Sequence, residues 1–155
     1  MYQLVIFIPL ILGFVISYIF RNENNFNKDG ETKPFWQPPG YMFSIIWSTL
    51  YLLNGFALYY VLTNYKGMEW NKLTIILSLF VLQLILENSW VIYTTQIKKS
   101  NFYQLLILFG LLLTILMRVL HFSSLNMVFV SLLISFEILW ISIAISLQAY
   151  NLKVC

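Results

Sequence analysis

Charged residues are scarce in this chain. Lysine, arginine, aspartate and glutamate together make up 10% of its 155 residues, whereas hydrophobic residues make up 60%. Soluble globular domains carry about a quarter charged residues. So few charges cannot cover the surface of a water-soluble domain, and that class of protein is excluded. The composition predicts an integral membrane protein.

Residues that bind metals or form covalent bonds are also few. The chain has one cysteine, Cys155, and one histidine, His121. One cysteine excludes an intramolecular disulfide, and one histidine without a second histidine or a cysteine nearby argues against a metal site. The sequence also lacks the Gly-x-Ser-x-Gly turn of serine hydrolases and the glycine-rich loops that bind phosphate. We therefore assign no catalytic residue, no metal and no required cofactor.

Long apolar stretches, by contrast, are abundant. Backbone groups at membrane depth have no water to bond, so an apolar stretch of about 20 residues crosses the hydrocarbon as a helix. Short segments between such stretches predict antiparallel neighbours. The prediction is an all-α integral membrane protein, one domain over residues 1–155 that forms a bundle of five transmembrane helices. The predicted helices cover residues 2–20, 41–62, 73–95, 102–120 and 125–150, with short loops near 63–72, 96–101 and 121–124.

Basic residues are unevenly distributed between alternate loops. Cytosolic loops of membrane proteins carry an excess of lysine and arginine. Six basic residues against three therefore predict that the amino terminus lies outside the cytosol and the carboxy terminus inside it. Because these residues form no cluster on a soluble module, we expect contact with the lipid bilayer and no nucleic-acid partner. The six are Arg21, Lys28, Lys33, Lys98, Lys99 and Lys153, and the three are Lys66, Lys72 and Arg118.

The longest polar segment, residues 21–40, ends in two adjacent prolines. Pro38 and Pro39 cannot continue a helix and hold the preceding loop extended, so Trp36 lies just outside the point where a helix can begin. The segment is long enough to fold over the mouth of the bundle as a lid. The alternative is a connector whose tryptophan anchors at the membrane interface.

Aromatic residues recur at helical spacing directly after this segment. Phe43, Trp47, Tyr51 and Gly55 follow one another every four residues, which places three rings and one position without a side chain on a single helical face. This face predicts a surface on which a flat aromatic ligand can lie.

Two acidic residues, Glu87 and Glu137, lie inside apolar stretches, near the middle of the third and fifth predicted helices. A carboxyl group in hydrocarbon costs about 2.5–3.5 kcal/mol on insertion scales, so each should face the bundle interior, either protonated or paired. Trp90 and Trp140 each follow one of them by three residues, which puts carboxyl and indole on one face. We hypothesise that Glu87 is protonated at neutral pH.

These residues predict either a ligand pocket or a set of interhelical hydrogen bonds. Polar contacts between membrane helices contribute about 0.6 kcal/mol each and need no ligand. We favour the pocket, because ionisable groups inside membranes are commonly functional. Its predicted lining is Gln83, Glu87, Trp90, Glu137 and Trp140 together with Trp47 and Tyr51, extended by Asn54.

The passage from Lys33 to Gly55 resembles the Lys-Pro-x-Trp-x-Pro-Pro-x-Trp-x-Phe-x-x-x-Trp-x-x-Leu-Tyr-x-x-x-Gly signature of the translocator protein family, also called tryptophan-rich sensory proteins or peripheral benzodiazepine receptors. The second tryptophan of that signature is Tyr41 here. A second block, from Gln83 to Trp90, is similar to the family's Gln-Leu-x-Leu-Asn-x-x-Trp on its third helix, with Glu87 in place of the asparagine. The signature positions that agree are Pro34, Trp36, Pro38, Pro39, Phe43, Trp47, Leu50, Tyr51 and Gly55.

The resemblance implies a five-helix bundle, commonly dimeric, with a pocket beneath the first loop. In the family this pocket accepts porphyrins and haem, isoquinoline and benzodiazepine drugs and, in animal members, cholesterol. On the fifth helix the family pattern departs, since Glu137 stands three rather than four residues before Trp140. The positions that match the family's pocket are Trp36, Pro38, Pro39, Trp47, Tyr51 and Trp90.

Three functions follow as expectations, and the third of them is an assembly or regulatory protein whose pocket is vestigial. The leading one is a non-enzymatic membrane receptor or transporter that binds a planar apolar molecule, a tetrapyrrole such as porphyrin or haem, or a sterol, and that forms a homodimer. For the sterol, Leu147, Tyr150 and Lys153 fit a permissive pattern proposed for cholesterol contact. The alternative is a membrane enzyme that transforms a bound tetrapyrrole or sterol, with Glu87 or Glu137 moving protons.

Overall fold

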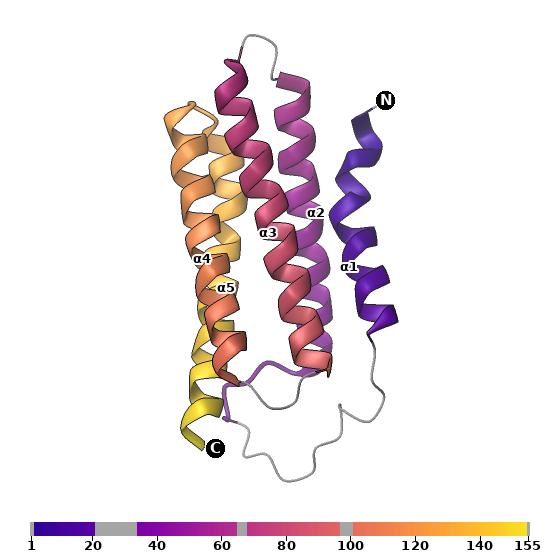
Figure 1. Cartoon of the computed structure of the whole chain (residues 1–155), viewed down its shortest axis with the longest axis vertical. Coiled ribbons are helices and arrows are strands. Elements are labelled where there is room, and N and C mark those ends of the chain that lie inside the picture. Colours follow the sequence, from indigo (N-terminus) through magenta and orange to yellow (C-terminus); the bar gives the residue numbers. More distant parts are fainter. Residues whose placement is uncertain (1, 21–33, 65–67, 97–100, 155) are drawn as a thin grey trace.

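The computed structural model describes residues 2–20, 34–64, 68–96 and 101–154. Within these ranges every regular element is a helix, which confirms the all-α class. The helices run alternately up and down, so that the two ends of the chain lie at opposite ends of the molecule (Figure 1). The elements are η1 (Tyr2–Phe7), α1 (Ile8–Ile19), α2 (Gly40–Asn64), α3 (Trp70–Gln96), α4 (Asn101–Ser124) and α5 (Val128–Val154).

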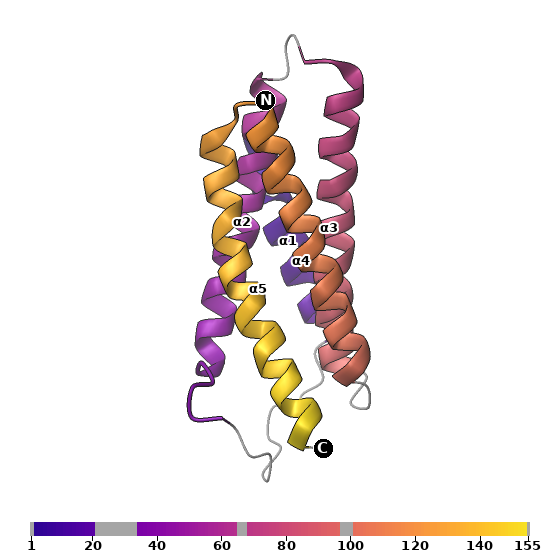
Figure 2. The same ribbon diagram turned by 90° about the vertical axis from the view of Figure 1, so that its left-hand side faces the viewer.

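The five long elements form a closed ring. The close helix contacts run from α1 to α2, from α2 to α5, from α5 to α4, from α4 to α3 and from α3 back to α1. Figures 1 and 2 show α4 alongside α5, with α1 at the side of the bundle away from them. Side chains from α2, α3, α4 and α5 therefore meet inside the ring, although these helices are distant in the sequence.

Four of the helices in the described part of the chain are long and apolar enough to cross a membrane. The amino-terminal segment was predicted as one helix over residues 2–20. That prediction is wrong, because the segment is not one continuous α-helix. Its first part, η1, is a 3-10 helix, and the α-helix begins at Ile8 with Pro9 in its first turn. Proline has no backbone N–H to donate, so it is tolerated at the start of an α-helix but interrupts the α-helical bonding before it.

The reach of this first segment bears on the count of membrane crossings. Residues in a 3-10 helix rise about 2.0 Å each and residues in an α-helix about 1.5 Å each. The 6 residues of η1 and the 12 residues of α1 therefore extend about 30 Å, which is close to the thickness of the hydrocarbon core. A fifth crossing is compatible with this length and stays a prediction.

Several helices extend beyond their predicted limits. The helix α3 begins at Trp70, three residues before the predicted residue 73. The expected loop at 121–124 is helical, because the stop signal comes later. Asn126 adopts a left-handed conformation with φ 57°. The N–H of Asn126 bonds the carbonyl of Ser123, and that of Met127 bonds Phe122, which is the Schellman arrangement that ends a helix. Apolar runs in the sequence indicate which residues lie in the hydrocarbon core of the membrane. They do not indicate where a helix ends.

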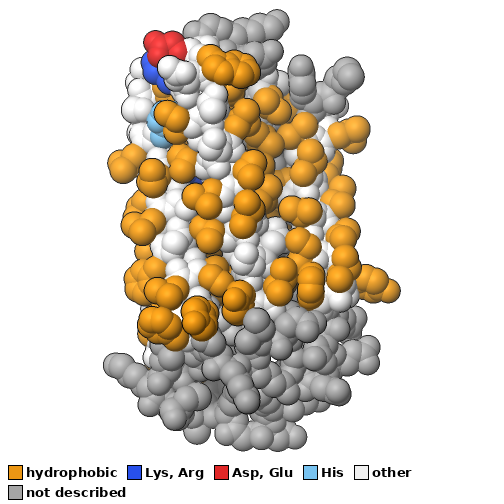
Figure 3. Space-filling model, viewed as in Figure 1, with side chains coloured by type: hydrophobic (Ala, Val, Ile, Leu, Met, Phe, Trp, Pro, Cys, Tyr) orange, Lys and Arg blue, Asp and Glu red, His pale blue; other side chains and the backbone are white. Residues whose placement is uncertain are grey.

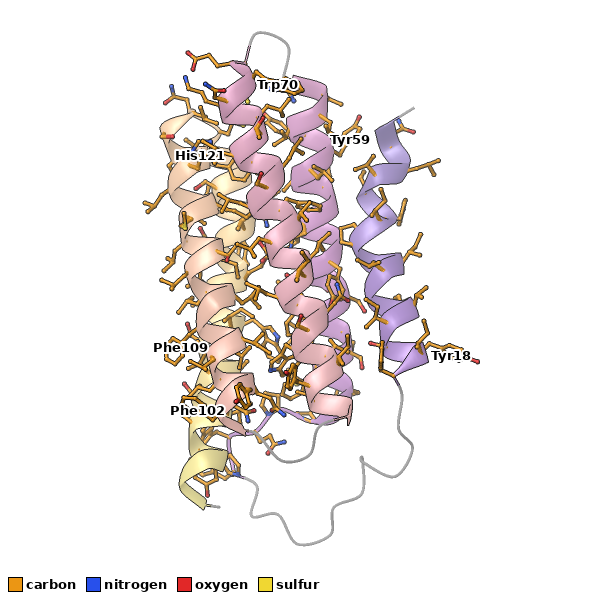
Figure 4. All side chains as sticks on the ribbon, in the orientation of Figure 1. Tyr18, Tyr59, Trp70, Phe102, Phe109 and His121 are labelled. Atoms are coloured by element: carbon orange, nitrogen blue, oxygen red, sulfur yellow. The ribbon has the colours of Figure 1, made fainter. Side chains whose placement is uncertain are left out.

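The outer surface of the bundle is apolar, and its interior carries polar groups. Figure 3 shows hydrophobic side chains over much of the visible face, with charged ones mainly at the upper end. Exposed aromatic residues lie toward both ends: Trp70 near the upper end, and Tyr18 and Phe102 near the lower one (Figure 4). Tryptophan and tyrosine favour the two membrane interfaces. This distribution is the one that a lipid-embedded bundle requires.

Candidate functional site

An aromatic cluster lies inside the ring between α2, α3 and α5. Trp47 of α2 stacks on Trp90 of α3, with ring centroids 5.3 Å apart and an interplanar angle of 26°. Trp47 also contacts Tyr51, one turn along α2, at 6.0 Å. Phe43 packs edge-on against Trp140 of α5 at 5.0 Å. The four-residue spacing on α2 thus places its rings on one face, as predicted, and the fold adds one tryptophan from each of two other helices. We call these five residues the aromatic cluster.

The polar atoms of this cluster have no hydrogen-bond partners among the described residues. The indole N–H groups of Trp47, Trp90 and Trp140 and the hydroxyl of Tyr51 are buried and unpaired. A buried donor without an acceptor costs about 1–3 kcal/mol. Such groups therefore mark a place where an additional acceptor is favourable. Trp47 and Trp90 are only partly buried, so part of the stacked pair remains exposed.

The amino-terminal segment covers one end of the aromatic cluster. Gly13 of α1 is buried, and a Cβ atom placed there would overlap the ring of Tyr51. At Gly55, an added Cβ would collide with the backbone of Ile6 in η1. The predicted ligand face therefore ends before Gly55, because the space at Gly55 is occupied by the η1 backbone.

The three loop residues predicted to line the pocket lie outside the aromatic cluster. Trp36 is 41% exposed, Pro39 is exposed and Pro38 is partly buried. Trp36 makes none of the ring contacts found between described residues. The two prolines directly precede α2, as predicted, and the carbonyl of Pro39 accepts a bond from the N–H of Met42 in its first turn. The lid predicted over 21–40 falls largely outside the described residues, which resume at residue 34.

A polar cluster lies farther along α2, α3 and α5, at mid-depth in the bundle, and includes one residue of α4. Asn54 Nδ2 donates to Glu137 Oε1 at 2.7 Å. Gln83 Nε2 donates to Glu87 Oε1 at 2.7 Å and to Glu137 Oε2 at 2.5 Å. The Nη1 atom of Arg118 donates to Asn54 Oδ1 at 2.6 Å and also to Gln83 Oε1. All five side chains are at least 98% buried. We call these residues, which come from α2, α3, α4 and α5, the polar cluster.

The guanidinium group of Arg118 is held from several sides. Its Cζ atom lies 5.5 Å from the ring centroid of Phe80 and 6.0 Å from that of Phe122, within the range of cation–π attraction. Among the described residues, no direct ion pair joins it to Glu87 or Glu137. The amides of Asn54 and Gln83 lie between the positive charge and the two carboxyl groups.

The sequence profile of the TspO/MBR family matches residues 5–153, which is nearly the whole chain. The chain belongs to the TspO/MBR family. It is also similar to a protein named tryptophan-rich protein TspO from Chlorobaculum tepidum, with 36% identity over 58 residues. That alignment covers 37% of this chain and 35% of the length of that relative. Family membership and the four long apolar helices identify an integral membrane protein.

In this member of the TspO/MBR family, sequence reasoning missed Arg118. We counted Arg118 as a loop residue when we predicted the orientation, but it is 2% exposed inside α4. Without Arg118 the second side has two basic residues, Lys66 and Lys72, against six. The signal was present in the sequence. Arg118 lies inside the fourth apolar stretch, where the rule applied to the two glutamates also holds.

Other predicted residues of this TspO/MBR chain lie away from both clusters. His121 belongs to the last turn of α4, near its upper end (Figure 4). No group of three or more metal-binding residues occurs in the described part of the chain. Within the sterol-like pattern, Leu147 is buried, Tyr150 is partly buried, and the side chain of Lys153 is not described. Leu147 therefore does not face the lipid.

Proposed function

We propose that this protein is a membrane receptor or transporter-like protein that binds a planar apolar ligand against the aromatic cluster. The proposed ligand is a tetrapyrrole, either a porphyrin or haem, and a sterol is the second ligand class. The observation that carries the proposal is the set of buried, unpaired donors on Trp47, Trp90, Trp140 and Tyr51. Membership of the TspO/MBR family supports a ligand-binding or transport role.

The chemistry of the cluster favours a tetrapyrrole over a sterol. Offset aromatic contacts contribute about 0.5–1.5 kcal/mol each beyond the burial of area, so several rings can hold a flat macrocycle. The unpaired N–H and O–H groups call for several acceptors on the ligand. A tetrapyrrole with carboxylate side chains offers several, whereas a sterol offers one hydroxyl group. The partly exposed stack of Trp47 and Trp90 is the surface that we assign to the macrocycle.

Assembly and orientation belong to the same proposal. We infer a homodimer with its amino terminus outside the cytosol and its carboxy terminus inside it. The opposite placement of the two chain ends supports termini on different sides of the membrane (Figure 1). The excess of basic residues in the segments that join the lower helix ends supports a cytosolic position for that end.

Protoporphyrin titration of the purified protein in nanodiscs tests the proposal. Tryptophan fluorescence reports binding, and the dissociation constant is compared between the wild type, Trp47→Phe and Trp70→Phe. The first variant keeps a ring but removes one unpaired donor. Trp70 is the matched control, because it is 78% exposed at the upper end of α3 (Figure 4). A lost hydrogen bond of about 1.4 kcal/mol weakens binding about tenfold.

The expected result is saturable quenching that Trp47→Phe weakens and Trp70→Phe leaves unchanged. Quenching that never saturates, or that responds equally to both substitutions, would overturn the tetrapyrrole assignment. A parallel titration with cholesterol separates the two ligand classes. Saturable binding of cholesterol alone would replace the tetrapyrrole by a sterol.

A second candidate function is enzymatic, and one observation favours it. Glu87 Oε2 is buried and has no partner within the described structure, so this oxygen is free to exchange a proton with a ligand. Tyr51 of the aromatic cluster lies within electrostatic range of this carboxyl group. Product analysis after incubation with protoporphyrin tests this function. Turnover that Glu87→Gln abolishes while binding is retained would establish an enzyme, whereas absence of any product leaves the receptor as the function.

A further inference from the structure

The hydrogen bonds of the polar cluster have a fixed direction. An arginine side chain can only donate, and an ionised carboxylate can only accept. The amides of Asn54 and Gln83 lie between them, so each turns its oxygen toward Arg118 and its NH₂ group toward the carboxyl groups. The two amides thus connect one positive group to two acidic groups without direct contact between the charges.

The charges in this cluster do not balance if both acids are ionised. Arg118 supplies one positive charge, and Glu87 and Glu137 would supply two negative charges. Tyr51 on α2 lies within electrostatic range of Glu87, His121 lies away from the cluster in the last turn of α4, and α1 contains no charged residue. An uncompensated charge buried in a membrane bundle is strongly unfavourable. One of the two acids is therefore neutral and holds a proton.

The hydrogen bonds distinguish the two carboxyl groups. Both oxygens of Glu137 accept N–H donors, one from Asn54 and one from Gln83, which suits an ionised carboxylate. Glu87 accepts through Oε1 only, and its Oε2 is buried and unpaired among the described residues. The free oxygen of Glu87 is the position available for a proton, and Glu137 is the counter-charge of Arg118.

We propose that the polar cluster is a binding site for one exchangeable proton at mid-depth in the membrane, with the proton carried by Glu87. The site stands on the polar cluster alone and does not depend on the identity of the ligand. Ionisable groups inside membrane bundles commonly lie on ion or proton pathways. If the proposed ligand binds next to this site, its affinity depends on pH through this proton, and only that consequence rests on the proposed function.

Infrared spectroscopy of the ligand-free protein in nanodiscs tests the site directly, through the carbonyl stretching band of protonated carboxyl groups. The charge balance predicts a different number of protonated carboxyl groups in the cluster for each variant at neutral pH. The wild type has one, which is lost as the pH rises. Glu87→Gln has none. Glu137→Gln also has none, because Glu87 becomes the counter-charge of Arg118.

Two further variants complete the series. Arg118→Gln removes the positive charge, so both acids take a proton and the band doubles. Glu69→Gln is the control, because Glu69 is an exposed partner of Lys72 at 3.4 Å, and its spectrum should match the wild type. If Arg118→Gln does not fold, Glu87→Gln and Glu137→Gln decide the outcome alone. A band that survives in Glu87→Gln, or a wild type without a titrating band, would overturn the proposal.

One experiment separates a proton from a metal cation. A sodium ion can also neutralise an acidic cluster. The titration is therefore repeated at constant ionic strength with sodium replaced by N-methylglucamine. A band with the same intensity and pH dependence in both salts supports the proton. A band that sodium removes at constant pH would mean that the site binds sodium, and the proton assignment would be wrong.

Discussion

The aromatic cluster and the polar cluster share α2, α3 and α5 but differ in how far their polar groups are paired, although Glu87 Oε2 and Arg118 Nε in the polar cluster lack a partner in the described structure. In the polar cluster, both amides and both oxygens of Glu137 have partners from other helices. In the aromatic cluster, three indole N–H groups and a hydroxyl have none in the described structure. The two clusters are close, since Tyr51 and Asn54 stand three residues apart on α2.

This difference distinguishes the polar groups that stabilise the bundle from the polar groups that are available to a ligand. Polar groups that form hydrogen bonds with one another across helices stabilise the fold. They leave few hydrogen-bonding atoms available to another molecule. Unpaired donors do not stabilise the fold. Their interaction becomes favourable when a ligand supplies hydrogen-bond acceptors. We infer that the polar cluster joins α2, α3, α4 and α5, while the aromatic cluster, covered by η1 and α1, is where a ligand is recognised. Substitutions in each cluster test this division.

The largest effect on stability is expected for Arg118→Met. Loss of the guanidinium leaves two amide oxygens and two acids without their positive partner. Removing one member of a buried charge pair destabilises by about 3–5 kcal/mol. The measurement is the free energy of unfolding in mixed micelles titrated with sodium dodecyl sulfate. Lys72→Met is the control and should change this energy by less than about 1 kcal/mol, since Lys72 forms an exposed ion pair.

A double variant sharpens this result. Arg118→Met combined with Glu137→Met replaces the charge pair by apolar side chains, which is often neutral for stability. The double variant should therefore be more stable than Arg118→Met alone. A double variant that is less stable would mean that Glu137 supports the fold without Arg118.

An intermediate effect is expected for Gly55→Ala. The added methyl group collides with the backbone of Ile6, which cannot move aside as a side chain can. Overpacking of this kind costs about 1–3 kcal/mol. Gly110→Ala on α4 is the matched control, because its Cβ would lie 3.8 Å from Leu86, an ordinary contact. Tryptophan fluorescence should change in Gly55→Ala, while the carboxyl band of the polar cluster should not. A change in both would mean that η1 also supports the polar cluster.

The smallest effect is expected for Tyr51→Phe. This substitution removes a hydroxyl that has no partner in the described structure and keeps the ring against Trp47 and Gly13, so no stability should be lost. Asn54→Leu, of similar size, leaves Arg118 and Glu137 each short of a partner and should cost about 1–3 kcal/mol. Equal losses in the two variants would remove the distinction between the clusters.

Local patterns in the sequence predicted much of this molecule. The scarcity of charge and the long apolar runs determined an all-helical membrane protein. The four-residue spacing from Phe43 to Tyr51 determined the aromatic face of α2, and the two prolines before Gly40 marked where that helix begins. The signature blocks indicated the family, which the profile match confirms. Each of these properties depends on residues near one another in the chain, through helical periodicity or the backbone chemistry of proline.

The tertiary structure alone decided which side chains meet. No spacing along the chain connects Asn54, Arg118 and Glu137, whose contacts join residues 64 and 83 positions apart. It also filled the space at Gly55 with the backbone of η1 and left Trp36 at the surface. The physical reason is that helix formation follows from local bonds, whereas the pairing of buried charges depends on which faces the closed ring of helices turns inward.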